Sequence, residues 1–374
     1  KALKCELMNL TRPRLLANSG SQATASLKKG AQTFMNLPGL VRNASSLVAL
    51  AICAACSGGS AGAPSTSPLN YQYIGKTLWM NGRPVTAARL NPTPRYATIF
   101  PDRHRRLKHF EYVFNFYGSY AGIFNYPKST AMIGQINGAG GQGCTNVLYG
   151  YGHKIFWNPG RMNDQIDEYK VPNKPIKSLS LNYTFTSSCA MNTSGDLAVG
   201  ILLGNSYGPG GQVVIYKNAT GTPTVYNTPL GKEYFNGYDP SGNLFADGEA
   251  GSSYNFMLVE LPKGSSQFVT IKTSNSPEFP GSVQWDGTYL TVFDQLTSEM
   301  YQYTVSGTTA TLKNTIQFTG VGDCAQTWIV KGLLYCGDVE NGGEVFDYPG
   351  GGAPIATFTG SFDSPLGVVA VKNR

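Results

Sequence analysis

The feature that most constrains the fold of this chain is a repeat of about 45 residues. One repeated element is an apolar strand that ends in Asn or Asp, and these polar residues follow one another at intervals of 43, 47, 42, 47 and 44 residues. They are Asn115, Asn158, Asn205, Asp247, Asp294 and Asp338. A period of about 20 to 50 residues is typical of solenoids, propellers and other repeat architectures.

A second repeated element keeps the same period. It is an alternating strand with an aromatic or acidic residue near its end, and these residues are 43, 47, 44, 43 and 45 positions apart. A third strand, such as 131–136 or 311–317, and a Gly-containing turn, such as 239–243, complete each unit. Four antiparallel strands repeated radially form a propeller blade. The six copies therefore predict an all-β, six-bladed β-propeller with four-stranded blades.

The C-terminal segment explains how such a ring would close. Residues 365–371 have the pattern of a first blade strand, whereas the other three strands of that blade are expected at 110–137. We expect the C-terminal strand to pair with the N-terminal blade and to remove an exposed sheet edge.

Two segments carry a resemblance to a known group of proteins. Residues 241–247 (SGNLFAD) and 189–199 (CAMNTSGDLAV) combine a Gly, an Asn or Asp and an apolar run. They resemble the turn-strand signature of secreted bacterial six-bladed propellers of the NHL and related lipoprotein type. The resemblance implies the architecture over about 265 residues, but this group includes scaffolds, ligand-binding proteins and enzymes, so it does not select a function.

The N-terminal residues predict export. A cationic start near Met35, an apolar run at 47–52 and small residues before Cys56 follow the layout of a secretory signal. Residues 54–59 resemble a lipobox, which makes Cys56 the candidate lipidated residue; the alternative is a cleaved signal with a coincidental Cys. We expect residues 1–55 to be a leader with Met35 as a candidate start, 56–107 a tether and 108–374 the propeller.

The charge distribution argues against nucleic acid as a partner. Residues 1–55 contain seven Lys or Arg and one acid, so the remainder carries only +1 of the formal +7. A short basic stretch at 95–108 is interpreted as a solvated segment rather than a phosphate-binding surface. We expect a monomer that contacts the membrane only through its lipid anchor.

The Asn and Asp residues of the repeat are the first candidate site. In a propeller they should ring one mouth of the channel, where Asp247 and Glu249 form the best local acidic pair. Converging oxygen ligands of this kind would suit Ca²⁺. The alternative is that each side chain binds its own loop backbone as an Asx-type turn, and then no cofactor is needed.

Other catalytic patterns have little support. The G-x-S-x-G match at 204–208 is expected in a blade loop rather than on a strand-turn-helix elbow. The three histidines, His104, His109 and His153, are expected away from the mouth. A Ser-His-acid triad is therefore not predicted.

The remaining cysteines predict structural bridges. Beyond Cys56, the mature chain contains Cys144, Cys189, Cys324 and Cys336, without a C-x-x-C motif. Two disulfides suit an oxidising compartment. We expect Cys324 to pair with Cys336 across a hairpin, and Cys144 with Cys189 between neighbouring blades.

These features favour a binding protein. We expect an extracytoplasmic, surface-tethered propeller that binds a partner protein or a glycan through its loop-rich mouth. Aromatic residues such as Trp157, Trp285 and Trp328 would bind the sugar faces of a glycan; the alternative is that these tryptophans pack between blades. The alternative is a metal-dependent hydrolase, lactonase or lyase that uses acids of the same mouth.

Overall fold

The structure is a computed structural model, and it describes residues 71–74, 77–80, 83–84, 107–116, 120–158, 165–181, 186–202, 210–251 and 255–373. The predicted leader, Cys56, Asn205, His104 and the 204–208 motif lie outside these residues. Three short strands precede the repeats and form their own antiparallel sheet: β1 (Tyr71–Ile74), β2 (Thr77–Met80) and β3 (Arg83–Pro84).

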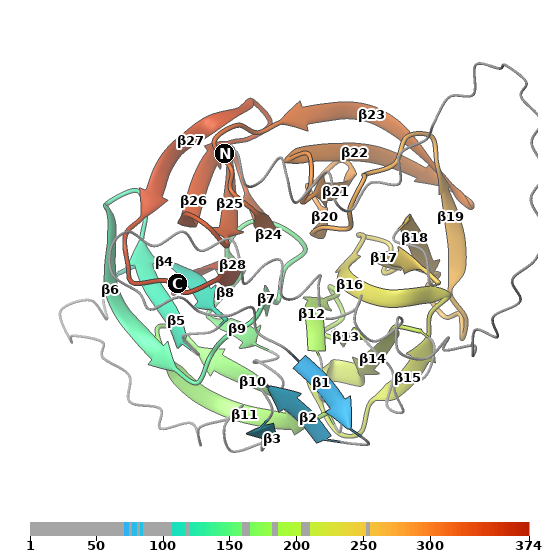
Figure 1. Cartoon of the computed structure of the whole chain (residues 1–374), viewed down its shortest axis with the longest axis horizontal. Helices are drawn as coiled ribbons and strands as arrows, with labels where there is room; N and C mark the ends of the chain where they lie inside the picture. The colour runs from blue at the N-terminus through green and yellow to red at the C-terminus, as the bar shows by residue number, and fades with distance from the viewer. Residues whose placement is uncertain are drawn as a thin grey trace, which may run out of the picture. The chain divides into compact units, whose positions relative to one another are not determined.

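The described residues from 107 to 373 form an all-β ring. Figure 1 shows their sheets arranged around a common centre. In this part of the chain the single helical element is the 3₁₀ turn η2 (Lys217–Ala219). No described helix has the length and apolar character needed to cross a membrane.

The first three sheets of the ring come from the N-terminal repeats and the C-terminal strand. One contains β4 (His109–Asn115), β5 (Tyr120–Asn125), β6 (Ser129–Asn137), β8 (Gly152–His153) and β28 (Pro365–Lys372). The next contains β7 (Cys144–Thr145), β9 (Ile155–Asn158), β10 (Gln165–Lys170) and β11 (Lys174–Ser180). The third contains β12 (Thr186–Met191), β13 (Leu197–Ile201), β14 (Gln212–Tyr216) and β15 (Thr224–Asn227).

The other two sheets complete the ring. The eight-stranded sheet contains β16 (Leu230–Tyr238), β17 (Leu244–Ala250), β18 (Phe256–Leu261), β19 (Val269–Thr273), β20 (Val283–Trp285), β21 (Leu290–Asp294), β22 (Glu299–Ser306) and β23 (Thr309–Gln317). The last sheet contains β24 (Cys324–Val330), β25 (Leu333–Asp338), β26 (Gly342–Asp347) and β27 (Gly351–Phe358).

This strand order differs in two places from the predicted set of separate four-stranded sheets. The outer strands β19 and β23 pair in parallel over two residues each, which joins two antiparallel runs into one eight-stranded sheet. The two-residue strand β8 also pairs in parallel with β28, so that sheet has five strands. Both differences arise from short backbone contacts between neighbouring units, which a repeat period does not encode.

The C-terminal strand closes the ring. β28 pairs antiparallel with β4 from Pro365↔Asn115 to Lys372↔His109, and Figure 1 shows the red β28 beside the cyan β4. The backbone N–H of Asn373 also donates to the carbonyl of Lys108 at 2.7 Å. The predicted pairing of the two ends of the propeller is therefore present.

The hydrophobic core is divided among the spaces between neighbouring sheets. Tyr112 and Phe114 of β4 pack against Phe156 of β9, with ring centroids 4.2 and 6.1 Å apart. Phe293 of β21 and Phe346 of β26 likewise belong to one buried cluster, between the eight-stranded sheet and the last sheet. Because the inner strands such as β4, β21 and β25 are covered on both faces, they are apolar along nearly their whole length, whereas outer strands such as β11 and β23 have exposed residues.

Candidate functional site: the mouth and channel of the ring

The polar residues of the repeat lie at the ends of equivalent strands. Asn115, Asn158, Asp294 and Asp338 end β4, β9, β21 and β25, and Asp247 lies within β17. All five are buried. We call the end of the ring at which these strands finish the mouth.

Backbone donors surround the two aspartates at the ends of β21 and β25. Asp294 accepts hydrogen bonds from the N–H groups of Glu278 (2.6 Å) and Leu296 (2.8 Å), among others. The Asp338 carboxylate accepts from Gly322 (2.6 Å) and Glu340 (2.8 Å) in the same way. Each carboxylate therefore connects two chain segments. One is the segment just before the innermost strand, β20 or β24, and the other is the turn that follows the strand of the aspartate itself.

The other three residues make related contacts. Asn115 Oδ1 accepts from the N–H of Asp363, which leads into β28, at 2.9 Å. Asn158 Nδ2 donates to the carbonyls of Gly140 (2.9 Å) and Gln142, ahead of β7. Asp247 accepts from the N–H groups of Phe235 (3.2 Å) and Gly281 (3.1 Å). These three side chains bind backbone groups of other chain segments rather than their own loops, so they do not form Asx-type turns. Asp294 and Asp338 do accept from N–H groups two residues ahead in their own turns. The ligand-binding role of the set stays a prediction.

The predicted pair Asp247 and Glu249 belongs to a larger buried polar cluster. Glu249 forms an ion pair with Lys232 at 2.8 Å and accepts a hydrogen bond from the Tyr234 hydroxyl at 2.7 Å. Burial and the nearby charge of Glu233 raise the pKa of Asp247 well above its usual value. The pair is thus held by protein groups and by burial, and neither carboxylate is presented to the surface.

Glu233 is the group in this cluster that sequence reasoning missed. Its carboxyl is buried between sheets and accepts hydrogen bonds from Ser187, Ser188 (3.2 Å) and Asn236 (3.1 Å). Burial raises its pKa to about 7, against the lowering effect of these hydrogen bonds. Gly200 makes room for it, because a Cβ there would overlap the carboxyl group.

The channel at the centre of the ring is lined by the innermost strand of each four-stranded run. Residues from β7, β12, β16, β20 and β24 surround it, including Thr145, Ser188, Asn236, Gln284 and Thr327. The open space is only about 30 Å³. A buried water needs roughly 10–15 Å³, whereas small-molecule sites measure about 300–1,000 Å³. The channel therefore has room for a few waters and not for a metabolite.

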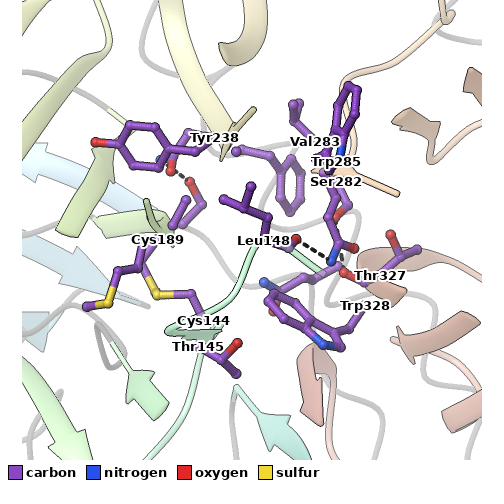
Figure 2. A pocket seen from close by; sticks show the side chains of 18 of the residues that line it. Cys144, Thr145, Leu148, Cys189, Tyr238, Ser282, Val283, Trp285, Thr327 and Trp328 are labelled. Atoms are coloured by element: carbon purple, nitrogen blue, oxygen red, sulfur yellow. Dashed lines mark hydrogen bonds between the residues drawn. A yellow bond between two sulfur atoms is a disulfide. The ribbon is translucent and has the colours of Figure 1, made fainter. Parts of the chain in front are cut away.

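A loop from one side of the ring reaches across the channel and narrows it. Residues 146–151, which we call the plug loop, follow β7, and Figure 2 shows Leu148 in the middle of the pocket. The Leu148 carbonyl accepts from Gln284 Nε2 at 3.1 Å, and the Gly150 carbonyl accepts from Trp328 Nε1 at 2.8 Å. The loop is thus bound to the eight-stranded sheet and to the last sheet, which are not the sheet that it leaves.

Two disulfides support the inner strands. Cys144 at the start of β7 is bonded to Cys189 of β12, which joins neighbouring sheets beside the channel (Figure 2). Cys324 and Cys336 link the adjacent strands β24 and β25. Both pairings are those that the sequence predicts.

The described histidines form no catalytic set with these groups. His109 stacks on Tyr151 with ring centroids 4.4 Å apart, and His153 is exposed. Both lie on strands at the plug-loop side, because His109 begins β4 whereas Asn115 ends it. The described part of the chain therefore offers neither histidine to the acids of the mouth.

A second buried acid also escaped sequence reasoning. Glu111 lies in β4, and one of its oxygens accepts from the N–H of Tyr126 at 2.7 Å. Burial raises its pKa to about 8, despite the lowering effect of hydrogen bonds from Tyr126 and Tyr151. The sequence signal for this buried acid was a charged residue inside an otherwise apolar strand. That signal is not specific, because a strand with one face in solvent shows the same pattern.

Comparison with known proteins supports the fold. A chain in the crystal structure of a nidogen–laminin complex superposes with a TM-score of 0.52 at 10% identity, over 71% of this chain and 99% of that one. A protein of unknown function from Bacteroides caccae superposes with a TM-score of 0.54, also at 10% identity and over 71% and 99% of the two chains. No protein-family model and no curated protein sequence matches the chain. The architecture is that of a β-propeller.

Proposed function

We propose that this protein is an exported, non-enzymatic β-propeller that binds a partner protein through the surface of its mouth. The observation that carries this proposal is the size of the channel, about 30 Å³. A ligand larger than a few waters does not fit the described part of the channel, which favours binding on the outer surface of the ring. The carboxylates described at the mouth already bind backbone N–H groups or Lys232, which favours recognition over acid-base chemistry.

Three further details belong to the same proposal. The ring counts as six blades when the eight-stranded sheet is divided between β19 and β23, where its two antiparallel runs meet. The disulfides suit an oxidising compartment, and Cys56 would tether the protein to the cell envelope. The nidogen–laminin structure shows that a propeller of similar architecture occurs in a protein complex, which favours a protein over a glycan as the partner.

The described part of the mouth offers a suitable contact surface. Leu296, in the turn after Asp294, is 39% exposed, and the Asp294 carboxylate fixes its N–H at 2.8 Å. Phe279 lies nearby in the chain segment bound by the same carboxylate and packs edge-on against Tyr234 with centroids 5.6 Å apart. Rigid, partly exposed apolar groups among polar turns are typical of protein-binding surfaces.

Site-specific photo-crosslinking tests this surface in the cells that produce the protein. A photoreactive residue at Leu296 should give a discrete adduct that excess purified protein competes away. Matched probes at Tyr149, on the plug loop, and at Ile355, on the outer strand β27, are similarly exposed at 45% and 53% and should give none. Adducts from Tyr149 or Ile355 in place of Leu296 would show that the partner binds another surface.

A further inference from the structure

Lysines gather at the end of the ring opposite the mouth. Residues 107–373 contain 14 Lys or Arg and 20 Asp or Glu, so the ring as a whole is acidic. In its first two sheets, however, the segments at this end contain six lysines and no Asp or Glu. These segments are 107–109, 126–128, 146–154, 170–174 and 372–373. We call the six lysines the basic patch; they are Lys108, Lys128, Lys154, Lys170, Lys174 and Lys372.

Strand pairing brings the basic patch together. Lys372, at the end of β28, lies opposite His109 at the start of β4. Its carbonyl accepts from the N–H of Lys154 at 2.9 Å, and the Lys154 carbonyl accepts from Val171, next to Lys170, at 2.9 Å. The patch therefore crosses from one sheet to the next, and Figure 1 shows the strands involved, β28, β4, β9 and β10, as neighbours.

The side chains of the basic patch are available to an external partner. Five of the six are exposed, and Lys372 is half-buried. Among the residues that the structure describes, none of the six has an acidic side chain within ion-pair distance, whereas Lys232 pairs with Glu249 at 2.8 Å. Lysines of one sign and without acidic partners form a positive field at this end of the ring.

Neighbouring groups do not cancel this field. Burial lowers the pKa of His109, and the charges of Lys108, Lys372 and Lys128 lower it further. Glu111, two residues along β4, is fully buried, and burial raises its pKa to about 8. It therefore keeps its proton at neutral pH and contributes little negative charge.

The mouth has the opposite electrostatic character. Its buried Asn and Asp side chains bind the backbone of Glu278, Glu340 and Asp363. The side chains of these three acids are exposed. A negatively charged surface would therefore attract the ring by the basic patch and turn the mouth away from itself.

We propose that the basic patch binds the anionic headgroups of a phospholipid membrane, which holds the mouth outward. All six residues are lysines, which act as point charges toward a layer of headgroups; arginine is the usual residue for two-pronged phosphate recognition in nucleic acids. A long polyanion would extend beyond the patch and meet the acidic remainder of the ring, whereas a planar membrane meets one end only. The contact is reversible and would add to a lipid chain on Cys56 rather than replace it.

The test uses the purified full chain at low salt, with vesicles of phosphatidylcholine alone or with added phosphatidylglycerol. The protein should bind the anionic vesicles more tightly, and high salt should release it. Each lysine near an anionic surface contributes about fivefold in affinity, so K128E/K154E should weaken binding by at least about 25-fold. The control K272E/K313E changes two exposed lysines of β19 and β23 by the same charge and should bind as the parent does.

Modification of lysines by an amine-reactive reagent identifies the surface in contact. Anionic vesicles should slow the modification of Lys154 and Lys170, located by peptide mass, and should leave Lys272 and Lys313 unchanged. The N-terminal cations are common to all the proteins, so differences between variants report the ring. Both double variants are melted to confirm that they fold.

Four outcomes would overturn the proposal. They are equal binding to the two kinds of vesicle, equal affinity of the two double variants, equal protection of all four lysines, and tighter binding to duplex nucleic acid than to anionic vesicles. None of these measurements involves the partner at the mouth, so the proposed function is tested separately by crosslinking at Leu296.

Discussion

Buried Asn and Asp side chains hold the loops at the mouth, and this role can be tested at a single residue. Asp294→Ala would remove the acceptor of N–H groups from two separate chain segments. Because buried donors without partners cost about 1–3 kcal/mol each, we expect a loss of at least about 2 kcal/mol in the free energy of unfolding, measured by urea titration. The control is Asp239→Ala, which removes a turn aspartate that accepts from Asn243 at 2.8 Å and is less buried. Equal losses would contradict the anchoring role.

Glu111 predicts a pH dependence of stability. Its pKa is about 8 in the folded protein and near 4.3 in an unfolded chain. Between these values the unfolded chain has lost the proton and the folded protein keeps it, so stability falls as pH rises. Each pH unit of separation corresponds to about 1.4 kcal/mol. We therefore expect Glu111→Gln to lose less stability than the parent between about pH 5 and pH 8, measured by urea unfolding at each pH. Parallel pH profiles for the two proteins would contradict this assignment.

Residue roles were only partly predictable from the sequence. The period of the repeat located Asn115, Asn158, Asp247, Asp294 and Asp338, because a requirement shared by every unit recurs along the chain. Glu111 and Glu233 have no counterparts at equivalent positions. Each is accommodated by side chains distant in sequence, such as Ser187 for Glu233, and a single sequence does not reveal such contacts.

At the scale of elements, the closing strand is the most sensitive point. Deleting residues 365–374 would remove Val368, Val369 and Val371, all fully buried, and would expose the edge of β4. Burial of each such side chain contributes roughly 1.5–3 kcal/mol. We expect the truncated protein to aggregate or to melt far below the parent in a thermal scan.

A shorter truncation serves as the control for this prediction. Removing only residues 373–374 deletes the Asn373 bonds to Lys108 and Leu107 but leaves β28 intact. It should lower the melting temperature only slightly. An unchanged melting temperature after the longer deletion would show that β28 does not stabilise the ring.

The strands that recur in every repeat could be predicted from the sequence, whereas the loops and the contacts between repeats could not. The apolar runs gave the positions of β4, β9, β21 and β25, since buried strands repeat their pattern. The plug loop was not anticipated, because residues 146–151 contain no periodic pattern and their partners Gln284 and Trp328 lie on distant strands. The β19–β23 pairing was missed for the same reason.

At the scale of the whole molecule, the cellular location of the protein depends on Cys56, which lies outside the described residues. If Cys56 is lipidated, cells fed a labelled fatty acid should incorporate the label into the protein, which should sediment with membranes. Cys56→Ala should abolish the label and move the protein to the soluble fraction, whereas Cys53→Ala, three residues upstream, should keep the label. Unchanged labelling of the Cys56 variant would exclude the lipoprotein assignment.

The pairing between β4 and β28 also determines when the ring can close during synthesis. Asn115 and Asp363, which hydrogen-bond across this pairing, are separated by 248 residues. During translation the edge of β4 stays unpaired until β28 is made, so the ring cannot close before residues 365–372 have been synthesised. A chain that stops before β28 is made would therefore keep the edge of β4 unpaired, and an unpaired edge of this kind is a template for association with other chains.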